Sequence, residues 1–315
     1  MKNILCLIVI VIVVLVFGTD LSAQVRLHSE RGVFTQANEH PILINPAYTG
    51  FRENHELLVN YRNTWASFPG APSTYTFSYD GAIGNRIGVG VQLLSDRFAS
   101  FETLKGLVSV SYGIKSETNN IRAGLSLEYL QHQISTADGT SVLVAPSDIE
   151  ILNRLDGSQF FDVSLGFYGE YMDKVIYGLT LPSLVSSMLN DFDNGTTGDK
   201  EFGAIVHLGY RHRIPDYDIV LEPSVIYKYL MLTPTHSDIN LKAKFLDESL
   251  TGGLTYSIGG ENRFGFLAGV NIDDFGFYYS YNISFNDFQQ YNNGGHELSF
   301  TYTIGKIQKD TVAKK

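Results

Sequence analysis

A shortage of cysteine, tryptophan and long apolar runs limits what this chain can be. The 315 residues include one cysteine, Cys6, and one tryptophan, Trp65. A single cysteine excludes a disulfide framework and a thiolate metal cluster. After residue 17 no apolar run approaches the about 20 residues that a transmembrane helix needs. Few segments show helical periodicity, so the rest of the chain is either soluble or a membrane barrel.

The first 23 residues are predicted to be a secretory signal peptide. Met1-Lys2-Asn3 gives a positive start, residues 4–17 are apolar, and Leu21-Ser22-Ala23 precedes the expected cleavage site before Gln24. The apolar run is short for a membrane span of about 20 residues, and a retained N-terminal anchor is the alternative. Cleavage would remove Cys6 and place the mature chain outside the cytoplasm.

The charge balance disfavours nucleic acid as a partner. The chain has 23 Lys and Arg residues against 33 Asp and Glu residues, which gives a formal net charge of −10. No basic patch emerges that could neutralise phosphates. We also expect no cofactor and no metal, because no motif for either is present.

Residues 73–94 show the pattern that repeats along the chain. Tyr75, Phe77 and Tyr79 alternate with small or polar residues, and after a Gly-Asn turn Val89 and Val91 alternate with glycine and glutamine. Alternation with a period of two places one set of side chains on each face of a strand. The segment is therefore predicted to be a β-hairpin.

Fourteen strand candidates of this kind follow one another. They are 55–63, 74–80, 87–96, 104–115, 121–133, 162–172, 175–181, 202–213, 218–228, 239–246, 250–257, 263–272, 275–284 and 296–305. Most odd-numbered connections are long, including 97–103, whereas the even-numbered ones are short; 258–262 is the weak member of the long set. Long loops outside and tight turns in the periplasm are typical of outer-membrane barrels. An even number of strands places both termini in the periplasm.

The two faces of these strands differ in a way that favours a barrel over a sandwich. One face is aromatic or branched aliphatic, whereas the other carries charges of both signs, such as Arg122, Glu128, Glu222 and Lys242. Mixed charges suit a wet lumen, and a closed barrel satisfies its backbone groups without water. We expect an all-β, transmembrane antiparallel barrel of about 14 strands. The predicted parts are the signal peptide 1–23, an N-terminal periplasmic arm or plug 24–54, the barrel 55–305 and a polar C-terminal tail 306–315.

Motifs for catalysis are weak. His296-Glu297 resembles half of a zinc-protease motif, but no histidine follows at position 300, so a structural role is preferred. His207 and His212 are five apart and should face opposite sides of one strand. Residues 191–195 resemble a calcium loop with failed spacing, and a solvated external loop is the better interpretation. We therefore expect no catalytic residues.

The segment Trp65-Ala66-Ser67-Phe68-Pro69-Gly70-Ala71-Pro72 is the more specific signal. Tryptophan, phenylalanine and two prolines make a stiff, largely apolar loop between the first two strands. Stiff aromatic surface loses little entropy on docking, which makes Trp65, Phe68, Pro69, Gly70 and Pro72 candidate partner-binding residues. The alternative is a loop folded over its own barrel mouth.

At these residues the chain resembles the PorP/SprF family of outer-membrane proteins of the Bacteroidetes type IX secretion and gliding machinery. The matching pieces are Phe34-Thr35-Gln36, Asn45-Pro46-Ala47-Tyr48-Thr49-Gly50, Tyr61-Arg62 with Trp65, Phe68-Pro69-Gly70-Ala71-Pro72, Asp162 with Gly166, Glu222-Pro223-Ser224 and Gly295-His296-Glu297. The resemblance implies structural roles for Asn45, Pro46, Tyr48, Gly50, Arg62, His296 and Glu297.

The resemblance also implies a function. It predicts a non-enzymatic barrel in the outer membrane that helps to export or anchor a large surface adhesin by binding it. Its expected partners are that cargo protein, the periplasmic ring components of the secretion system and outer-membrane lipid. Two alternatives stay open: a channel or uptake protein for small solutes, since about fourteen strands can enclose a narrow lumen, and a membrane-embedded hydrolase.

Overall fold

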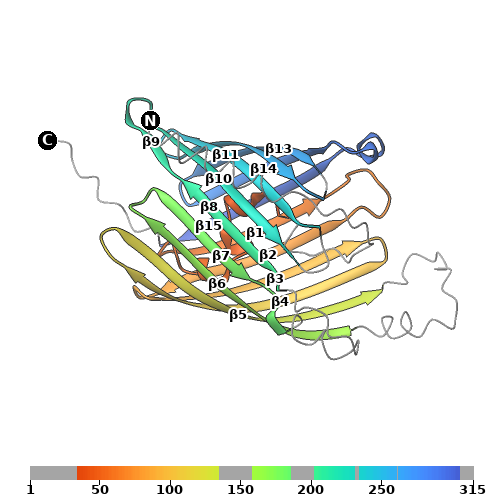
Figure 1. Ribbon diagram of the computed structural model, residues 1–315, viewed down its shortest axis with the longest axis horizontal. Helices are drawn as coiled ribbons and strands as arrows, with labels where there is room; N and C mark the ends of the chain where they lie inside the picture. Colours follow the sequence, from red (N-terminus) through yellow and green to blue (C-terminus); the bar gives the residue numbers. More distant parts are fainter. Residues whose placement is uncertain (1–33, 135–157, 186–201, 231–233, 261, 306–315) are drawn as a thin grey trace.

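The computed structural model describes residues 34–134, 158–185, 202–230, 234–260 and 262–305, and strands dominate these ranges (Figure 1). In chain order the strands are β1 (His55–Asn63), β2 (Ser73–Ile83), β3 (Ile87–Phe98), β4 (Phe101–Lys115), β5 (Asn119–Ile134), β6 (Ser158–Tyr171), β7 (Val175–Leu181), β8 (Ala204–Tyr210), β9 (His212–Ile214), β10 (Ile219–Tyr229), β11 (His236–Phe245), β12 (Leu250–Ile258), β13 (Arg263–Ile272), β14 (Phe275–Ser284) and β15 (Gly295–Ile304). Among the described residues, no helix has the length and apolar character needed to cross a bilayer.

The strands form one antiparallel sheet that closes on itself. Strands adjacent in sequence pair with one another, and the last strand, β15, pairs with the first, β1. Both β8 and β9 pair with β10, so the fifteen strands make a barrel of fourteen. When β8 and β9 are counted as one, closure gives each of the fourteen barrel strands two hydrogen-bonded neighbours, which is the condition that hydrocarbon imposes on a membrane-spanning sheet. The predicted antiparallel barrel is confirmed.

The split between β8 and β9 has a local cause in β10. The pairing of β8 with β10 stops at Ser224 and that of β9 begins at Leu221, so the gap lies beside Pro223. Proline has no N–H to donate to a neighbouring strand. Arg211 lies in this gap, and its Nε donates to Glu222 Oε1 at 2.6 Å. The break thus positions a charged side chain inside the barrel.

The connections differ between the two ends of the barrel. At one end, the short-turn end, the turns are 84–86, 116–118, 172–174, 215–218, 246–249 and 273–274; the other end is the long-loop end. One predicted long connection, 97–103, is wrong. Strand β3 continues to Phe98 and β4 begins at Phe101, which leaves only Ala99 and Ser100 in the turn. Ala99 has a φ of 52°, the left-handed conformation used in tight hairpin turns.

The two faces of the wall are sorted as the alternation predicts. On β4, Val108, Val110 and Tyr112 are more than half exposed on the outer face, whereas Ser109 and Ser111 between them are buried. The outer face is the apolar belt that lipid requires. Charged residues of the inner face are buried and do not line a water-filled lumen. The residues Arg122, Glu128, Lys228 and Glu297 are each at most 2% exposed.

Residues 34–54, here called the lumenal segment, bury this inner face. The segment contains the short 3-10 helices η2 (Gln36–Asn38), η3 (Pro41–Leu43) and η4 (Pro46–Tyr48) and lies inside the ring of strands (Figure 1). Its apolar side chains pack against inward-facing apolar residues from four strands and from the end of β10: Leu58, Leu94, Ile205, Ile226 and Leu230. A second cluster joins Ala47, Tyr48 and Phe51 to Tyr168 and Ile176. The described core of the protein is therefore the contact between segment and wall.

Candidate functional site

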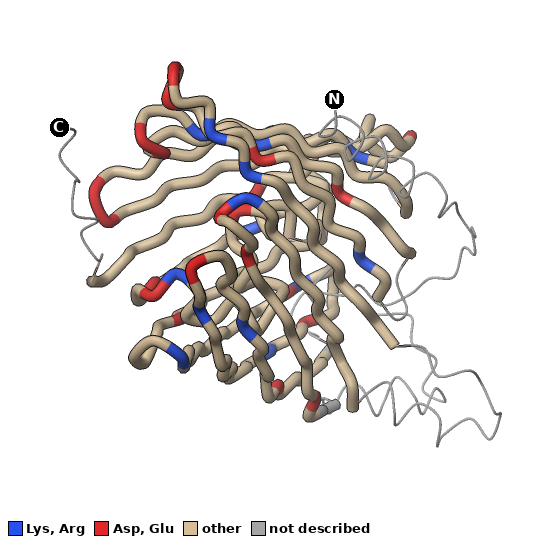
Figure 2. The backbone as a smooth tube through the Cα atoms, turned by 60° about the vertical axis from the view of Figure 1, so that its left-hand side comes forward, with Lys and Arg blue, Asp and Glu red and all other residues tan. Residues whose placement is uncertain are grey.

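A cavity of about 1140 Å³, here called the vestibule, opens at the short-turn end. Its walls include the turn residues 115–120 and 172–174, and its floor is made by the lumenal segment through Glu39, Tyr48 and Arg52. Acidic residues gather on the turns around this end of the barrel (Figure 2). The vestibule is thus a polar chamber that is open on one side and floored on the other.

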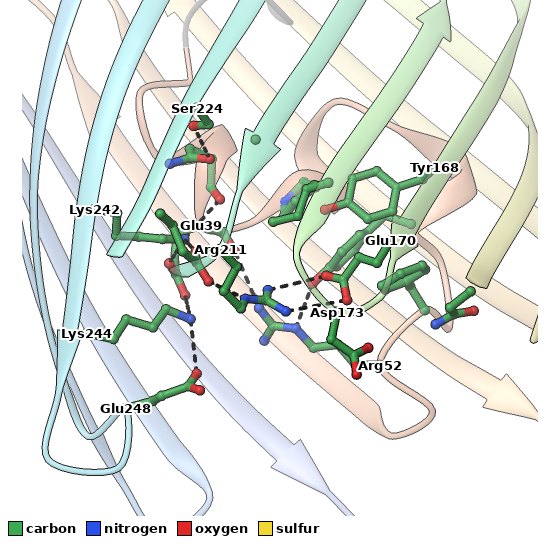
Figure 3. A pocket seen from close by; sticks show the side chains of 18 of the residues that line it. Glu39, Arg52, Tyr168, Glu170, Asp173, Arg211, Ser224, Lys242, Lys244 and Glu248 are labelled. Atoms are coloured by element: carbon green, nitrogen blue, oxygen red, sulfur yellow. Dashed lines mark hydrogen bonds and ion pairs between the residues drawn. The ribbon is translucent and has the colours of Figure 1, made fainter. Parts of the chain in front are cut away.

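A chain of ion pairs runs along one side of the vestibule (Figure 3). Lys242 Nζ lies 2.7 Å from Glu39 Oε2 and 2.9 Å from Glu222 Oε2. Arg211 joins Glu222 to Glu170, with its terminal nitrogen 3.3 Å from Glu170 Oε1. These contacts tie the floor to β6, β10 and β11. Removing one partner from such a buried pair costs about 3–5 kcal/mol, so the network fixes the lumenal segment in place.

Arg52 forms a second contact set on the floor. Its Nε donates to the Tyr48 hydroxyl at 2.6 Å, and its terminal nitrogen lies 3.2 Å from Glu56 Oε2. The rings of Tyr48 and Phe51 stack with centroids 5.6 Å apart, and Tyr168 meets both edge-on. The floor therefore presents a guanidinium group beside an aromatic cluster.

The charge of Glu39 depends on its partners. Burial opposes ionisation of this carboxyl group, but the ammonium groups of Lys242 and Lys244 outweigh that effect and hold its pKa well below the ordinary value. Glu39 is therefore ionised at neutral pH and forms a charged pair with Lys242.

The pKa of the neighbouring His40 is lowered as well, but here burial is the cause and the neutral form is favoured. Burial lowers its pKa from 6.5 to about 3, with Glu39 opposing this shift and Arg52, Lys242 and Lys244 adding to it. Its ring meets the edge of Tyr278 with centroids 4.9 Å apart. The neutral imidazole is therefore the form that the folded protein keeps.

Replacing His40 with phenylalanine should make the barrel less sensitive to acid between pH 6.5 and 4.5. In this pH window His40 binds a proton in the unfolded chain but stays neutral in the folded chain. The contribution of His40 to the free energy of unfolding is therefore fully present above about pH 6.5 and is lost as the pH falls. The loss approaches about 1.4 kcal/mol per pH unit for one group. Urea midpoints in detergent, measured across this window, should fall less steeply for the variant. Equal slopes for the two proteins would contradict the assignment.

The box Asn45–Gly50 lies against a stripe of inward-facing glycines. Asn45 Nδ2 donates to Phe167 O at 3.0 Å, and its Oδ1 accepts from Ala47 N at 2.9 Å. A Cβ on Gly124 would lie 2.5 Å from Ala47 N, and one on Gly166 would lie 2.3 Å from Asn45 Oδ1. Contacts this close to the barrel backbone leave no room for a Cβ and require glycine at both positions. Two pieces of the family resemblance, the Asn45–Gly50 box and Gly166, thus meet inside the barrel.

Gly50 completes the same contact. Its φ of 66° is left-handed, and its N–H donates to Asp80 Oδ2 at 2.9 Å. A Cβ there would lie 2.8 Å from Gly88 Cα. Pro46 begins η4, where its fixed φ suits the first helical position.

Glu297 anchors the start of the lumenal segment. It is fully buried; its carboxylate accepts from Thr35 N at 2.9 Å, from Asn60 Nδ2 at 2.9 Å and from the Thr35 hydroxyl. Gln36 Nε2 donates to the Glu297 carbonyl at 3.0 Å, and Arg62 lies 4.0 Å from the carboxylate. Arg62 and Glu297, 235 positions apart in sequence, are thus brought together.

His296 points the other way. Its Nδ1 lies 2.8 Å from the Tyr279 hydroxyl, and its ring packs beside Tyr279 and Tyr281. The adjacent pair His296-Glu297 therefore does not share one site. In the part of the chain that the structure describes, no three His, Cys, Asp or Glu residues are grouped to hold a metal ion. Residues 191–195, with their calcium-loop resemblance, lie outside the described residues.

Residues 65–72, here called the tryptophan loop, lie at the long-loop end of the barrel, whereas the vestibule opens at the short-turn end. Trp65 is half-buried, with the rings of Phe98 and Phe288 packed against it, and Phe68 packs on Phe288 while staying 39% exposed. Pro69 and Gly70 are exposed. Pro72 is buried, and its carbonyl oxygen accepts from Thr64 N at 2.9 Å.

This loop is held by its neighbours on both sides. Ala66 N donates to Gly294 O at 2.8 Å, Asn293 N donates to Ala66 O at 2.8 Å, and Ala99 N donates to Gly70 O at 3.0 Å. Trp65 and Ser67 have φ values of 58° and 71°, which non-glycine residues adopt only where the surroundings enforce them. Trp65 is thus a packing residue of the rim, and Phe68 is the exposed apolar member.

The vestibule is not recognisable as a site in the sequence. Of the binding and structural candidates drawn from the sequence, Tyr48 alone lines the vestibule. His207, which the sequence analysis did not favour as a metal ligand, and the matching piece Glu222-Pro223-Ser224 line it as well. Glu39 and Arg52 stand in a turn-rich segment without periodicity. The basic partners of Glu39, Lys242 and Lys244 on β11, are more than 200 positions away in sequence. Two signals were available: the charges on the inner strand faces and the Glu222-Pro223-Ser224 piece of the resemblance. Neither identifies which residues pair with these charges.

One comparison with a solved structure, that of CymD, agrees with the barrel. The monoaromatic hydrocarbon channel CymD superposes with a TM-score of 0.50 at 13% identity, over 86% of this chain and 93% of that one. Omp33 of Acinetobacter baumannii gives a TM-score of 0.48 at 8% identity, over 80% of this chain and 98% of that one. The toluene transporter TodX of Pseudomonas putida gives 0.45 at 10% identity, over 85% and 93%. At 13% identity, the match with CymD shows a shared fold and nothing about function.

Sequence comparison is more specific. No curated protein sequence matches this chain. A family model, described as the type IX secretion system membrane protein PorP/SprF, matches residues 29–302 and thus includes the lumenal segment and nearly the whole barrel wall. The chain therefore belongs to the PorP/SprF family of type IX secretion system proteins, as an outer-membrane β-barrel of that system.

Proposed function

We propose that this barrel works in type IX secretion without catalysis, by binding a large exported surface protein and helping to export or anchor it. The observation that carries the proposal is the lumenal segment. It fills the barrel between the vestibule and the long-loop end, with Phe34, Gln36, Ala47 and Thr49 each at most 1% exposed. A barrel closed in this way is better suited to holding a protein than to passing solutes.

The proposed orientation follows the two ends. Short turns of outer-membrane barrels face the periplasm and long loops face outside. The vestibule would then face the periplasmic components of the secretion system, and the tryptophan loop would face the cell surface. Both termini would lie in the periplasm.

We assign contact with the exported protein to the exposed part of the tryptophan loop. Phe68, Pro69 and Gly70 project from a loop whose backbone is tied to β14–β15 and to the β3–β4 turn. A surface already fixed in the free protein loses little entropy when a partner docks. Trp65 supports Phe68 through the shared ring of Phe288.

The alternative function is a channel for small solutes. A fold shared with a hydrocarbon channel does not decide between the two, because barrels of one fold serve many functions. Purified protein in planar bilayers should show little or no steady conductance. Large, stable, solute-selective currents would put the channel first.

Replacing Phe68 with alanine should reduce surface display of the exported protein, while the barrel itself accumulates normally in the outer membrane. An anchor residue of this kind contributes about 2 kcal/mol or more, roughly a thirtyfold change in affinity. Display is measured with antibody on whole cells that carry only the variant, beside cells that lack the chain.

Trp65→Phe is the matched control, because it keeps a ring between Phe98 and Phe288 without touching the exposed surface. Normal display with Phe68→Ala would show that the loop is only a lid. Normal display in cells that lack the chain altogether would refute the proposed function.

A further inference from the structure

The vestibule holds more negative charge at its mouth than in its interior. Its deeper lining carries four acidic and four basic residues, which are Glu39, Glu56, Glu170, Glu222, Arg52, Arg211, Lys242 and Lys244. At the mouth six acidic residues, Glu117, Asp173, Asp247, Glu248, Asp273 and Asp274, face three basic ones, Lys115, Lys174 and Arg213. The excess of three negative charges lies where a ligand would enter, and charge focused at a cleft raises the local concentration of oppositely charged ligands.

A polar group inside the vestibule points to a ligand independently of that charge. His207 lines the cavity and is only 4% exposed, yet neither ring nitrogen has a hydrogen-bond partner among the described residues. A neutral imidazole offers one donor and one acceptor. Buried polar groups are normally paired, so His207 is ready to bind a group that both donates and accepts, as a peptide amide does.

The size and lining of the vestibule fit a polypeptide segment better than a small molecule. Small-molecule pockets of about 300–1,000 Å³ are mostly apolar, whereas this cavity is about 1140 Å³ and open at one end. Its lining includes the amide side chains of Asn54 and Asn120, which can pair with backbone groups. The amides of Asn38 and Asn271 also line it but are already bonded to Ser224, Glu248 and Tyr278. The rings of Tyr48 on the floor and of Tyr168 on β6 also line it.

We propose that the vestibule binds an extended segment of a partner polypeptide that carries lysine or arginine and enters from the short-turn end. The acidic mouth attracts the segment, His207 and the amide side chains pair with its backbone, and the ion-paired floor stops it. The inference rests on the proposed function and gives it a second, periplasmic contact, separate from the tryptophan loop.

The test uses the full chain in detergent and three fluorescein-labelled probes, which are repeats of Gly-Ser-Lys, Gly-Ser-Gln or Gly-Ser-Glu of equal length. Fluorescence anisotropy should show binding of the lysine probe, at least about tenfold weaker binding of the glutamine probe and none of the glutamate probe. Raising the salt to about 0.5 M should weaken binding of the lysine probe, because exposed charges are then screened.

Two variants locate the site. The double variant Asp173→Asn, Asp247→Asn should bind the lysine probe about tenfold more weakly, roughly threefold for each exposed charge. Both positions have left-handed φ values of 54° and 52°, which asparagine tolerates. His207→Leu should also weaken binding. Asp287→Asn, at the exposed start of η6 (Asp287–Tyr291) on the long-loop end, is the control and should bind normally.

Equal binding of the lysine and glutamate probes, or normal binding by both vestibule variants, would overturn the inference. Heat-modifiable migration on gels shows that each variant is a folded barrel. Binding that appears only after removal of residues 306–315, which contain four lysines, would show that the chain itself supplies the occupant and would also overturn it. If the lysine probe does not bind but Phe68→Ala still reduces display, the proposed function is kept and only the proposed vestibule site is rejected.

Discussion

Replacing Gly124 with valine should open the barrel to ions while its strands stay assembled. The added Cβ would lie 2.5 Å from Ala47 N and 2.6 Å from Ala47 Cα, and both of these atoms are backbone. A side chain could rotate away, but a backbone held on several sides cannot, and overpacking of this kind costs about 1–3 kcal/mol or more. We expect the lumenal segment to leave its place and the purified variant to conduct steadily in planar bilayers, where the parent does not.

A second measurement follows the segment directly. Cys6 is the chain's only cysteine and lies in the predicted signal peptide, so an introduced cysteine would be the sole thiol of the mature chain. The substitution Ala37→Cys places that thiol at a position that is 1% exposed. It should resist a maleimide reagent in the parent and react quickly when combined with Gly124→Val.

The control for both measurements is Gly252→Val. A Cβ at Gly252 of β12 would have no neighbour within 4 Å, and valine favours strands. This variant should not conduct, and it should leave the thiol of Ala37→Cys protected from maleimide. If the Gly124→Val barrel does not conduct and its Ala37→Cys thiol does not react, the barrel wall has moved to accommodate the valine and the lumenal segment has kept its place.

The barrel wall could be predicted from sequence because its alternation is local. Four strands, β1, β7, β13 and β14, have the predicted bounds. The strand predicted over 202–213 is divided into β8 and β9, and the others differ by a few residues at their ends. The 97–103 connection was missed because alternation continues through it: β3 and β4 remain paired from Asp96 with Thr103 to Phe98 with Phe101. A hairpin whose turn is only two residues long gives little polar or glycine signal.

The interior could not be predicted, because it depends on contacts between distant parts of the chain. Leu58, Leu94, Ile205 and Ile226 are apolar residues on the polar face, and in sequence they look like departures from the pattern. They are explained once the lumenal segment lies against them. The inward glycines also look like weak strand positions until the box at residues 45–50 is seen to need their space.

The vestibule illustrates the same limit. Glu39 and Lys242 form its central ion pair at 2.7 Å, yet 203 positions separate them. Neither spacing nor composition joins two such charges, because their proximity follows from barrel closure and from the path of the lumenal segment. The tryptophan loop was recognisable for the opposite reason, since its aromatic and proline residues are close together in sequence.

Replacing Glu297 with alanine should destabilise the barrel more than any single substitution on its rim. Glu297 is fully buried, and its carboxylate accepts from the Thr35 and Asn60 nitrogens. It also faces the guanidinium group of Arg62, which is itself 2% exposed. Truncation leaves that cation and the Thr35 amide without their acceptor. Breaking a buried pair from one side costs about 3–5 kcal/mol.

The loss should appear as a lower urea midpoint in detergent, read by heat-modifiable migration on gels, and as faster maleimide reaction at Ala37→Cys. The matched control is Arg97→Ala, which breaks the ion pair with Glu102 at the rim, where Arg97 is 65% exposed. An exposed pair contributes at most about 1 kcal/mol, so the control midpoint should barely move. If Glu297→Ala and Arg97→Ala shift the midpoint equally, Glu297 does not anchor the lumenal segment. If the midpoint falls but the thiol stays protected, Glu297 stabilises the wall alone and the start of the segment is held by its other contacts.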